Sequence, residues 1–135
     1  MREATVELTV PFHDVDVLHV VWHGHYYKYL EVARTALMKS AGLDVPDLIA
    51  LDLKMMVVES HCRYLRPLHY DERFTVTARF AEVGHRIVIT YDVRSVTHAR
   101  RVARGRTALV TLSPQGELLV DTPAVILERI AGNAP

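Results

Sequence analysis

Two aspartates and three histidines crowd one short stretch of the chain, "DVDVLHVVWHGH" at positions 14–25. These ionisable residues are Asp14, Asp16, His19, His23 and His25. Carboxylates and imidazoles in such a group can bind a metal ion, carry out acid, base or nucleophilic catalysis, or simply shape a polar turn. Each of these three chemistries makes a different demand on the surrounding structure.

The metal-binding hypothesis rests on the pattern H-x3-H-x-H, which an aspartate at position 14 or 16 would complete to four ligands. An H-x3-H spacing suits two ligands on one helical turn, but here it straddles the expected junction between a loop and a helix. A cysteine-based zinc cage is excluded because Cys62 is the single cysteine. We therefore predict no metal at this segment.

In the second hypothesis the aspartates form turns and the histidines are solvated or satisfied by local hydrogen bonds. The residues that follow, "VLHVVW" at 17–22, count against it because they are too apolar for a free surface loop. We expect them to be buried or to lie at an interface. A carboxylate on a buried segment is costly unless it is paired or used.

The third hypothesis is acyl transfer at a carboxylate beside the start of a helix. Asp16 could act as a nucleophile or as a general base for water. A helix is expected to begin near His23, where free N–H groups and the helix dipole would stabilise the oxyanion formed on a carbonyl. Gly24 would let a substrate approach the backbone closely.

Hydrophobic periodicity predicts the elements that position this segment. Residues 4–10 alternate as in a half-buried strand, and a loop follows at 11–24. Apolar residues recur every three or four positions over 25–41, which predicts one long helix, and Gly42 follows it where a left-handed C-cap residue belongs. The apolar stripe consists of Tyr26, Tyr29, Leu30, Ala33, Leu37 and Ala41.

The remainder of the chain is mostly strand-like. Four segments rich in β-branched and aromatic residues predict antiparallel strands, at 54–65, 72–83, 86–97 and 101–112. A helical turn is expected within 44–52, and 121–131 is either a strand end or a helical turn. The predicted class is α+β, with the helix stripe packed on one sheet face and the uncovered edges available for dimerisation.

Length and composition indicate one domain over residues 1–135, because no linker or repeat interrupts the chain. Acidic and basic residues balance at 16 each, so net charge favours neither nucleic acid nor an anionic membrane as a partner. No stretch is apolar enough for a signal peptide or a membrane helix, and one cysteine cannot form an intrachain disulfide. The expected location is the reducing cytoplasm.

Over nearly its whole length the chain resembles the hotdog-fold acyl-CoA thioesterases, in particular the 4-hydroxybenzoyl-CoA thioesterase and YbgC-like group. The matching motifs are D-x-D at 14–16, V-V-aromatic-H at 20–23, Tyr26, and L-E-x-A-R at 30–34. The segment "RYLRPLHYDE" at 63–72 is similar to a turn that precedes a long strand in this family.

This resemblance implies a hotdog fold, in which a five-stranded antiparallel sheet wraps one long central helix. It also implies hydrolysis of acyl thioesters without a metal or dissociable cofactor, in a homodimer or homotetramer. The catalytic carboxylate of the family falls on Asp16, and the backbone N–H that polarises the thioester carbonyl falls on His23.

The sequence departs from the family pattern at two positions, which affects the expected substrate. His19 stands where the family usually has glycine, and His25 where it has a small or amide residue. An acyl carrier protein thioester is therefore a candidate substrate beside acyl-CoA. The turn at His85 and Arg86 is expected near the nucleotide of coenzyme A. The candidate substrate-binding residues are Trp22, Gly24, His25, Tyr26, His19, His85 and Arg86.

Other carboxylates and other functions compete with these assignments. Glu31 is an alternative catalytic residue, although its spacing from Arg34 favours a helix surface pair. Glu59 lies in a predicted strand. Its side chain either points inward, where it needs a partner, or faces solvent at an edge of the sheet. The alternative functions are a non-hydrolytic acyl-CoA or acyl-carrier binding subunit, and a hotdog-type enoyl thioester hydratase or dehydratase.

Overall fold

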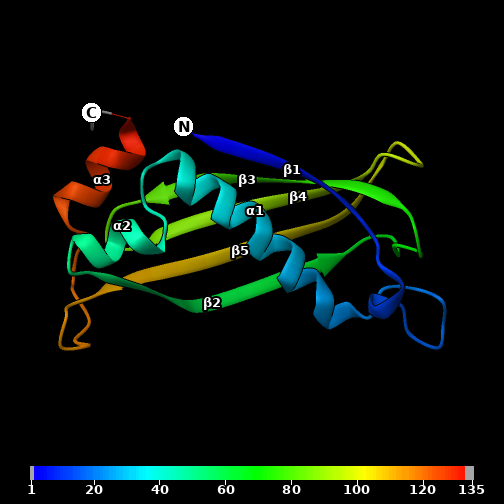
Figure 1. Ribbon diagram of the computed structural model, residues 1–135, viewed down its shortest axis with the longest axis horizontal. Coiled ribbons are helices and arrows are strands. Elements are labelled where there is room, and N and C mark those ends of the chain that lie inside the picture. Colours follow the sequence, from blue (N-terminus) through cyan, green and yellow to red (C-terminus); the bar gives the residue numbers. More distant parts are fainter. Residues whose placement is uncertain (1, 133–135) are drawn as a thin grey trace.

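The computed structural model describes residues 2–132. One long helix, α1 (Tyr26–Ser40), lies along one face of a five-stranded sheet (Figure 1). The strands are β1 (Glu3–Thr9), β2 (Lys54–Tyr64), β3 (Arg73–Val83), β4 (Ile87–Ser95) and β5 (Arg100–Leu112). Each expected strand and the long helix are thus present, with ends that differ from the predicted ones by one or two residues.

The sheet has the order β1-β3-β4-β5-β2, and all neighbouring strands are antiparallel. β3, β4 and β5 follow one another through tight turns and form the centre of the sheet. β1 and β2 are the two edges, so the chain places strands from its first half on both sides of a meander from its second half (Figure 1). This is the α+β hotdog arrangement that was expected.

The core lies between α1 and the inner face of the sheet. The predicted helix stripe is buried at every position, and it meets alternate residues of β3 and β4 such as Phe74, Val76 and Ile89. Gly105 of β5 marks a close approach, because a Cβ there would lie 2.6 Å from Leu30 Cδ1. The helix therefore sits directly on the central strands.

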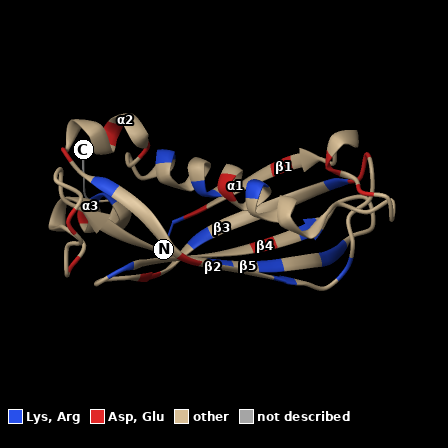
Figure 2. Cartoon of the chain, turned by 90° about the horizontal axis from the view of Figure 1, so that it is seen from below, with Lys and Arg blue, Asp and Glu red and all other residues tan. Residues whose placement is uncertain are grey.

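The outer face of the sheet is charged, so it adds no second core. Figure 2 shows basic segments along β5, away from the helix. Arg104 is exposed there, Arg101 lies 2.9 Å from Asp92, and Arg106 lies 4.0 Å from Glu82. Within residues 2–132 no helix is long and apolar enough to cross a membrane.

Two short helices resolve the segments that periodicity left uncertain. α2 (Val45–Ala50) is the helical turn expected within 44–52, and a reciprocal capping box between Asp44 and Asp47 starts it. α3 (Ala124–Ala131) shows that 121–131 is helical rather than a strand end. Its Ile126 and Ile130 are buried in the core.

Gly42 ends α1 in the way the sequence predicts. Its φ is +69°, and its carbonyl accepts a 2.6 Å hydrogen bond from the Arg129 guanidinium of α3. An L-residue in this left-handed conformation is strained, because its Cβ approaches the neighbouring carbonyl oxygen. Gly42 therefore stops the helix and turns the chain toward α2.

Replacing Gly42 by alanine should lower the free energy of unfolding by about 1–2 kcal/mol, because of this left-handed conformation. Urea unfolding followed by circular dichroism would measure it. Gly84→Ala is the matched control, since a Cβ at Gly84 meets nothing within 4 Å and its φ is not positive. Equal unfolding midpoints for the two variants would contradict the assignment.

Candidate active site

Residues 14–22 form a two-stranded ribbon that leads into α1. Val15 and Val21 pair across it, the Asp16 N–H donates to the Val20 carbonyl at 2.9 Å, and the Trp22 N–H donates to the Asp14 carbonyl at 3.1 Å. We call residues 14–22 the site ribbon. It lies at the end of the sheet where α1 begins (Figure 1).

The turn of the site ribbon explains the unusual histidine. The His19 N–H donates to the Asp16 carbonyl at 2.9 Å, and His19 has a φ of +68°. A three-residue hairpin loop needs a left-handed residue at its third position, which glycine fills without strain. His19 occupies the position where the resemblance implied glycine, so the departure keeps the turn but strains it.

Asp16 begins this turn, and one of its two carboxylate oxygens accepts a hydrogen bond. Its Oδ1 accepts a 2.8 Å hydrogen bond from the Leu18 N–H, a typical aspartate turn. Within residues 2–132 no hydrogen bond engages Oδ2. Val17 and Leu18 are 93% and 75% exposed in the single chain, so of the two expectations for this segment, burial or an interface, burial within one chain does not hold for them.

The buried carboxylate of the segment is Asp14, not Asp16. Asp14 is 1% exposed, and it accepts hydrogen bonds from Tyr29 Oη at 2.5 Å and from Lys28 Nζ at 2.6 Å. Burial opposes its ionisation, but the bonds from Lys28 and Tyr29 outweigh burial and hold the pKa of Asp14 below its ordinary value. Sequence analysis missed this role, because only the fold brings both α1 side chains to Asp14.

The start of the helix is exposed to a small cavity. His23–His25 form one turn of 3₁₀ helix before α1, and within residues 2–132 the His23 N–H donates no hydrogen bond. The His23 carbonyl accepts a 2.7 Å bond from Tyr64 Oη. A cavity of about 240 Å³ adjoins it, lined by Val21, His23, Tyr26, Tyr64, Leu65, Arg66 and Pro67.

Two tyrosines support this cavity from the α1 and β2 sides. Tyr26 is 2% exposed, and its hydroxyl accepts the Leu68 N–H at 3.2 Å. Burial raises the pKa of Tyr26 and of Tyr64 to about 12. Both hydroxyls therefore stay protonated near neutral pH and can donate hydrogen bonds.

The Trp22 ring packs against two histidine rings beside the helix start, tilted to one and edge-on to the other. The Trp22 ring lies 5.0 Å from the His23 ring and 5.3 Å from the His25 ring. His25 Nε2 lies 3.9 Å from Asp14 Oδ1. A Cβ on Gly24 would lie 2.2 Å from the Trp22 ring, so glycine at this position makes room for the indole.

The other nominated residues lie elsewhere in the single chain. The turn with His85 and Arg86 joins β3 to β4 at the opposite end of the sheet from the site ribbon (Figure 1). His85 bonds Asp121, and Arg86 Nη1 lies 3.3 Å from Glu59 Oε2. Glu59 thus faces solvent at an edge strand.

The alternative helix carboxylate, Glu31, pairs with Arg34 at 3.6 Å, which confirms the expected surface pair. Across residues 2–132 no three histidine, cysteine, aspartate or glutamate side chains are placed to hold a metal ion. The candidate chemistry of this end of the fold therefore rests on Asp16, the His23 N–H and the adjoining cavity.

Comparisons with known proteins identify the family of the chain. Residues 18–102, more than half of the chain, match the sequence model of the thioesterase superfamily. A candidate esterase from Synechocystis sp. is 28% identical over 120 residues, covering 87% of this chain and 72% of that protein. A candidate acyl-CoA thioesterase from Bacillus subtilis is 33% identical over 76 residues, covering 56% of this chain and 55% of that protein.

Solved structures share the fold at low sequence identity. A 1,4-dihydroxy-2-naphthoyl-CoA thioesterase from Synechocystis has a TM-score of 0.82 at 22% identity, covering 99% of this chain and 100% of its own. A 4-hydroxybenzoyl-CoA thioesterase variant, solved with 4-hydroxybenzoyl-CoA, has a TM-score of 0.85 at 20% identity, covering 96% and 99%. The chain therefore belongs to the thioesterase superfamily and is a thioester hydrolase of the hotdog fold.

Proposed function

We propose that the protein hydrolyses acyl-CoA thioesters at the start of α1. The observation that carries this proposal is His23, which lines a cavity beside the ribbon that carries Asp16 and whose N–H has no hydrogen-bond partner within residues 2–132. A free N–H at a helix start stabilises negative charge on a carbonyl oxygen as it develops.

In the proposed reaction the thioester carbonyl accepts the His23 N–H. Asp16 takes a proton from water, and the resulting hydroxide adds to the carbonyl carbon. The tetrahedral oxyanion then collapses, the carbon–sulfur bond breaks, and the thiolate takes the proton from Asp16. The products are a carboxylic acid and a thiol. Direct attack by Asp16 to form an anhydride, which water then cleaves, gives the same products.

The free oxygen of Asp16 supports this role. Because Oδ1 is bonded to the Leu18 N–H, the carboxylate has one fixed orientation and one oxygen left for the substrate or water. The aromatic side chains of Trp22 and Tyr26 flank the helix start and would contact the acyl group. The exposed His19 and the half-buried His25 would influence which acyl group is accepted.

The acyl-CoA assignment follows from the similar proteins, which include aromatic acyl-CoA thioesterases and one protein whose structure was determined in complex with CoA. A thioester of an acyl carrier protein is the second candidate substrate. In either case Arg86 would meet phosphate groups, because guanidinium pairs well with phosphate.

We further propose that the working unit contains at least two subunits paired along β2. β2 is an edge strand, and three apolar residues in its first half, Met56, Val57 and Val58, are 40–49% exposed. Unpaired apolar edges favour strand addition. An antiparallel two-fold pairing would run the sheets in opposite directions and bring the partner subunit's β3–β4 turn toward the helix start of this chain.

Asp16→Asn should lower kcat for the best acyl-CoA substrate by on the order of 10²–10⁴-fold, because the amide cannot take a proton or attack. Thiol release measured across short, long and aromatic acyl-CoAs would test this. Asp52→Asn is the matched control, since Asp52 has a φ of +60° that asparagine tolerates and lies in the turn between α2 and β2. Near-normal turnover by Asp16→Asn would refute the catalytic role.

Val58→Lys should convert the protein to monomers, because a residue near the two-fold axis of a β2 pair would meet its own copy and the charges would repel. Sedimentation velocity measures the change. Val96→Lys, a 37% exposed valine in the turn between β4 and β5, should leave the assembly unchanged. A monomeric wild-type protein, or an unchanged Val58→Lys assembly, would contradict the pairing.

A further inference from the structure

A second buried carboxylate, Glu72, lies outside the proposed reaction. It is 4% exposed and sits where the segment after β2 turns into β3. A buried charge is costly unless several partners stabilise it. Its partners therefore indicate what the residue holds in place.

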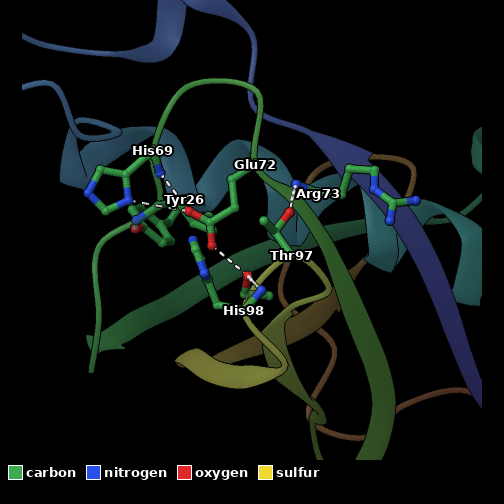
Figure 3. A network of polar contacts seen from close by, with 8 residues as sticks. Tyr26, His69, Glu72, Arg73, Thr97 and His98 are labelled. Atoms are coloured by element: carbon green, nitrogen blue, oxygen red, sulfur yellow. Dashed lines mark hydrogen bonds and ion pairs between the residues drawn. The ribbon is translucent and has the colours of Figure 1, made fainter.

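Glu72 joins β4 to the segment at 66–72. Its Oε2 accepts a 2.5 Å hydrogen bond from Ser95 Oγ at the end of β4. Its Oε1 accepts the His69 N–H at 2.9 Å and lies 3.4 Å from His69 Nδ1. Figure 3 shows the Glu72 carboxylate between His69 on one side and His98 on the other.

The surroundings keep this carboxylate ionised. Burial opposes ionisation, but the hydrogen bonds from Ser95 and His69 outweigh it, so the pKa of Glu72 lies below its ordinary value. The His98 N–H donates to Ser95 Oγ at 3.0 Å, which turns the Ser95 hydroxyl toward Glu72. Glu72 is thus a fixed, charged acceptor anchored to the central sheet.

The segment that Glu72 anchors is bonded directly to the site ribbon. His69 pairs with Val20, and the Val21 N–H donates to the Leu68 carbonyl at 2.9 Å. The Leu68 N–H donates to the Tyr26 hydroxyl of α1. Residues 66–72 therefore form a third extended segment beside the two strands of the ribbon, and we call them the strap.

The strap is also tied to the chain that enters the ribbon. The Val10 N–H donates to the Glu72 carbonyl at 3.0 Å, and the Asp71 N–H donates to the Val10 carbonyl at 3.0 Å. Glu72 thus contacts the sheet through its side chain and the entry to the ribbon through its backbone. Ribbon, strap and sheet are connected in one series of bonds.

We propose that Glu72 is a positioning residue that sets the strap, and through it the site ribbon, at the distance from the sheet that the reaction requires. This inference rests on the proposed function of Asp16 and His23. Without the carboxylate, the His69 N–H and the Ser95 hydroxyl lose a buried acceptor. The strap keeps the bond from the Arg66 N–H to the Val102 carbonyl of β5, but its His69–Glu72 end loses its side-chain tie to β4. A shift of about 1 Å in a catalytic group costs up to about 100-fold in rate.

Glu72→Ala should lower kcat for an acyl-CoA substrate by about 10- to 100-fold with little change in KM, while near-UV circular dichroism shows a folded protein. Glu72→Gln should restore kcat to within a few-fold of wild type, because its amide oxygen still accepts the His69 N–H and its NH₂ can donate to Ser95.

Thr97→Ala is the matched control. It removes a 3.0 Å bond from the Arg73 N–H in the same neighbourhood (Figure 3), but Thr97 has no bond to the strap. A kcat for Glu72→Ala equal to that of Thr97→Ala would overturn the proposal. So would a folded Glu72→Gln protein as impaired as Glu72→Ala.

Hydrogen exchange measured on the same variants separates this inference from the proposed function. Glu72→Ala should speed exchange of the Val21 and Trp22 amides, while the β4 amides keep their protection. This holds whether or not Asp16 proves catalytic, so normal turnover by Asp16→Asn would refute only the proposed mechanism. Unchanged exchange in the ribbon would refute the positioning role. If Glu72→Ala does not fold, Ser95→Ala should show the same changes to a smaller degree, and wild-type exchange and kcat in that variant would refute the role.

Discussion

The packing of the α1 stripe on the inner face of the sheet is the constraint on which the rest of the structure depends. The stripe and the central strands form the only sizeable apolar contact of the described chain, and the charged outer face of the sheet contributes none. Gly105 allows the helix to lie close to β5. This contact fixes where α1 begins. It therefore also fixes the place at which His23 lines the cavity.

Two buried carboxylates hold the site ribbon against that frame. Asp14 ties one side of it to Lys28 and Tyr29 on α1, and Glu72 ties the strap on the other side to β4. Each is ionised despite burial because charged or hydroxyl donors outweigh the cost of desolvation. Asp16 lies between these anchors at a strained turn, which suits a group that must keep one orientation.

Much of the fold was predictable because its signals are local. The period of the apolar residues predicted α1, Gly42 predicted its end, and β-branched runs predicted the four later strands to within one or two residues. The choice between strand and helix was undecided for 121–131, where a short apolar run suits either element, and burial of Ile126 and Ile130 favours the helix. Strand order was not predictable, because edge strands β1 and β2 pair with distant partners.

Motifs in the sequence suggested the family and the hotdog fold through resemblance, and residue type and spacing within one segment made Asp16 and His23 candidates. The folded chain was needed to show that Asp14 is the buried aspartate, that His19 takes the left-handed turn position, and that Glu72 bonds Ser95. The physical reason is that ionisation and burial depend on partners 14 or more residues away, such as Lys28 for Asp14 and Ser95 for Glu72. Those partners become neighbours only when the helix settles on the sheet.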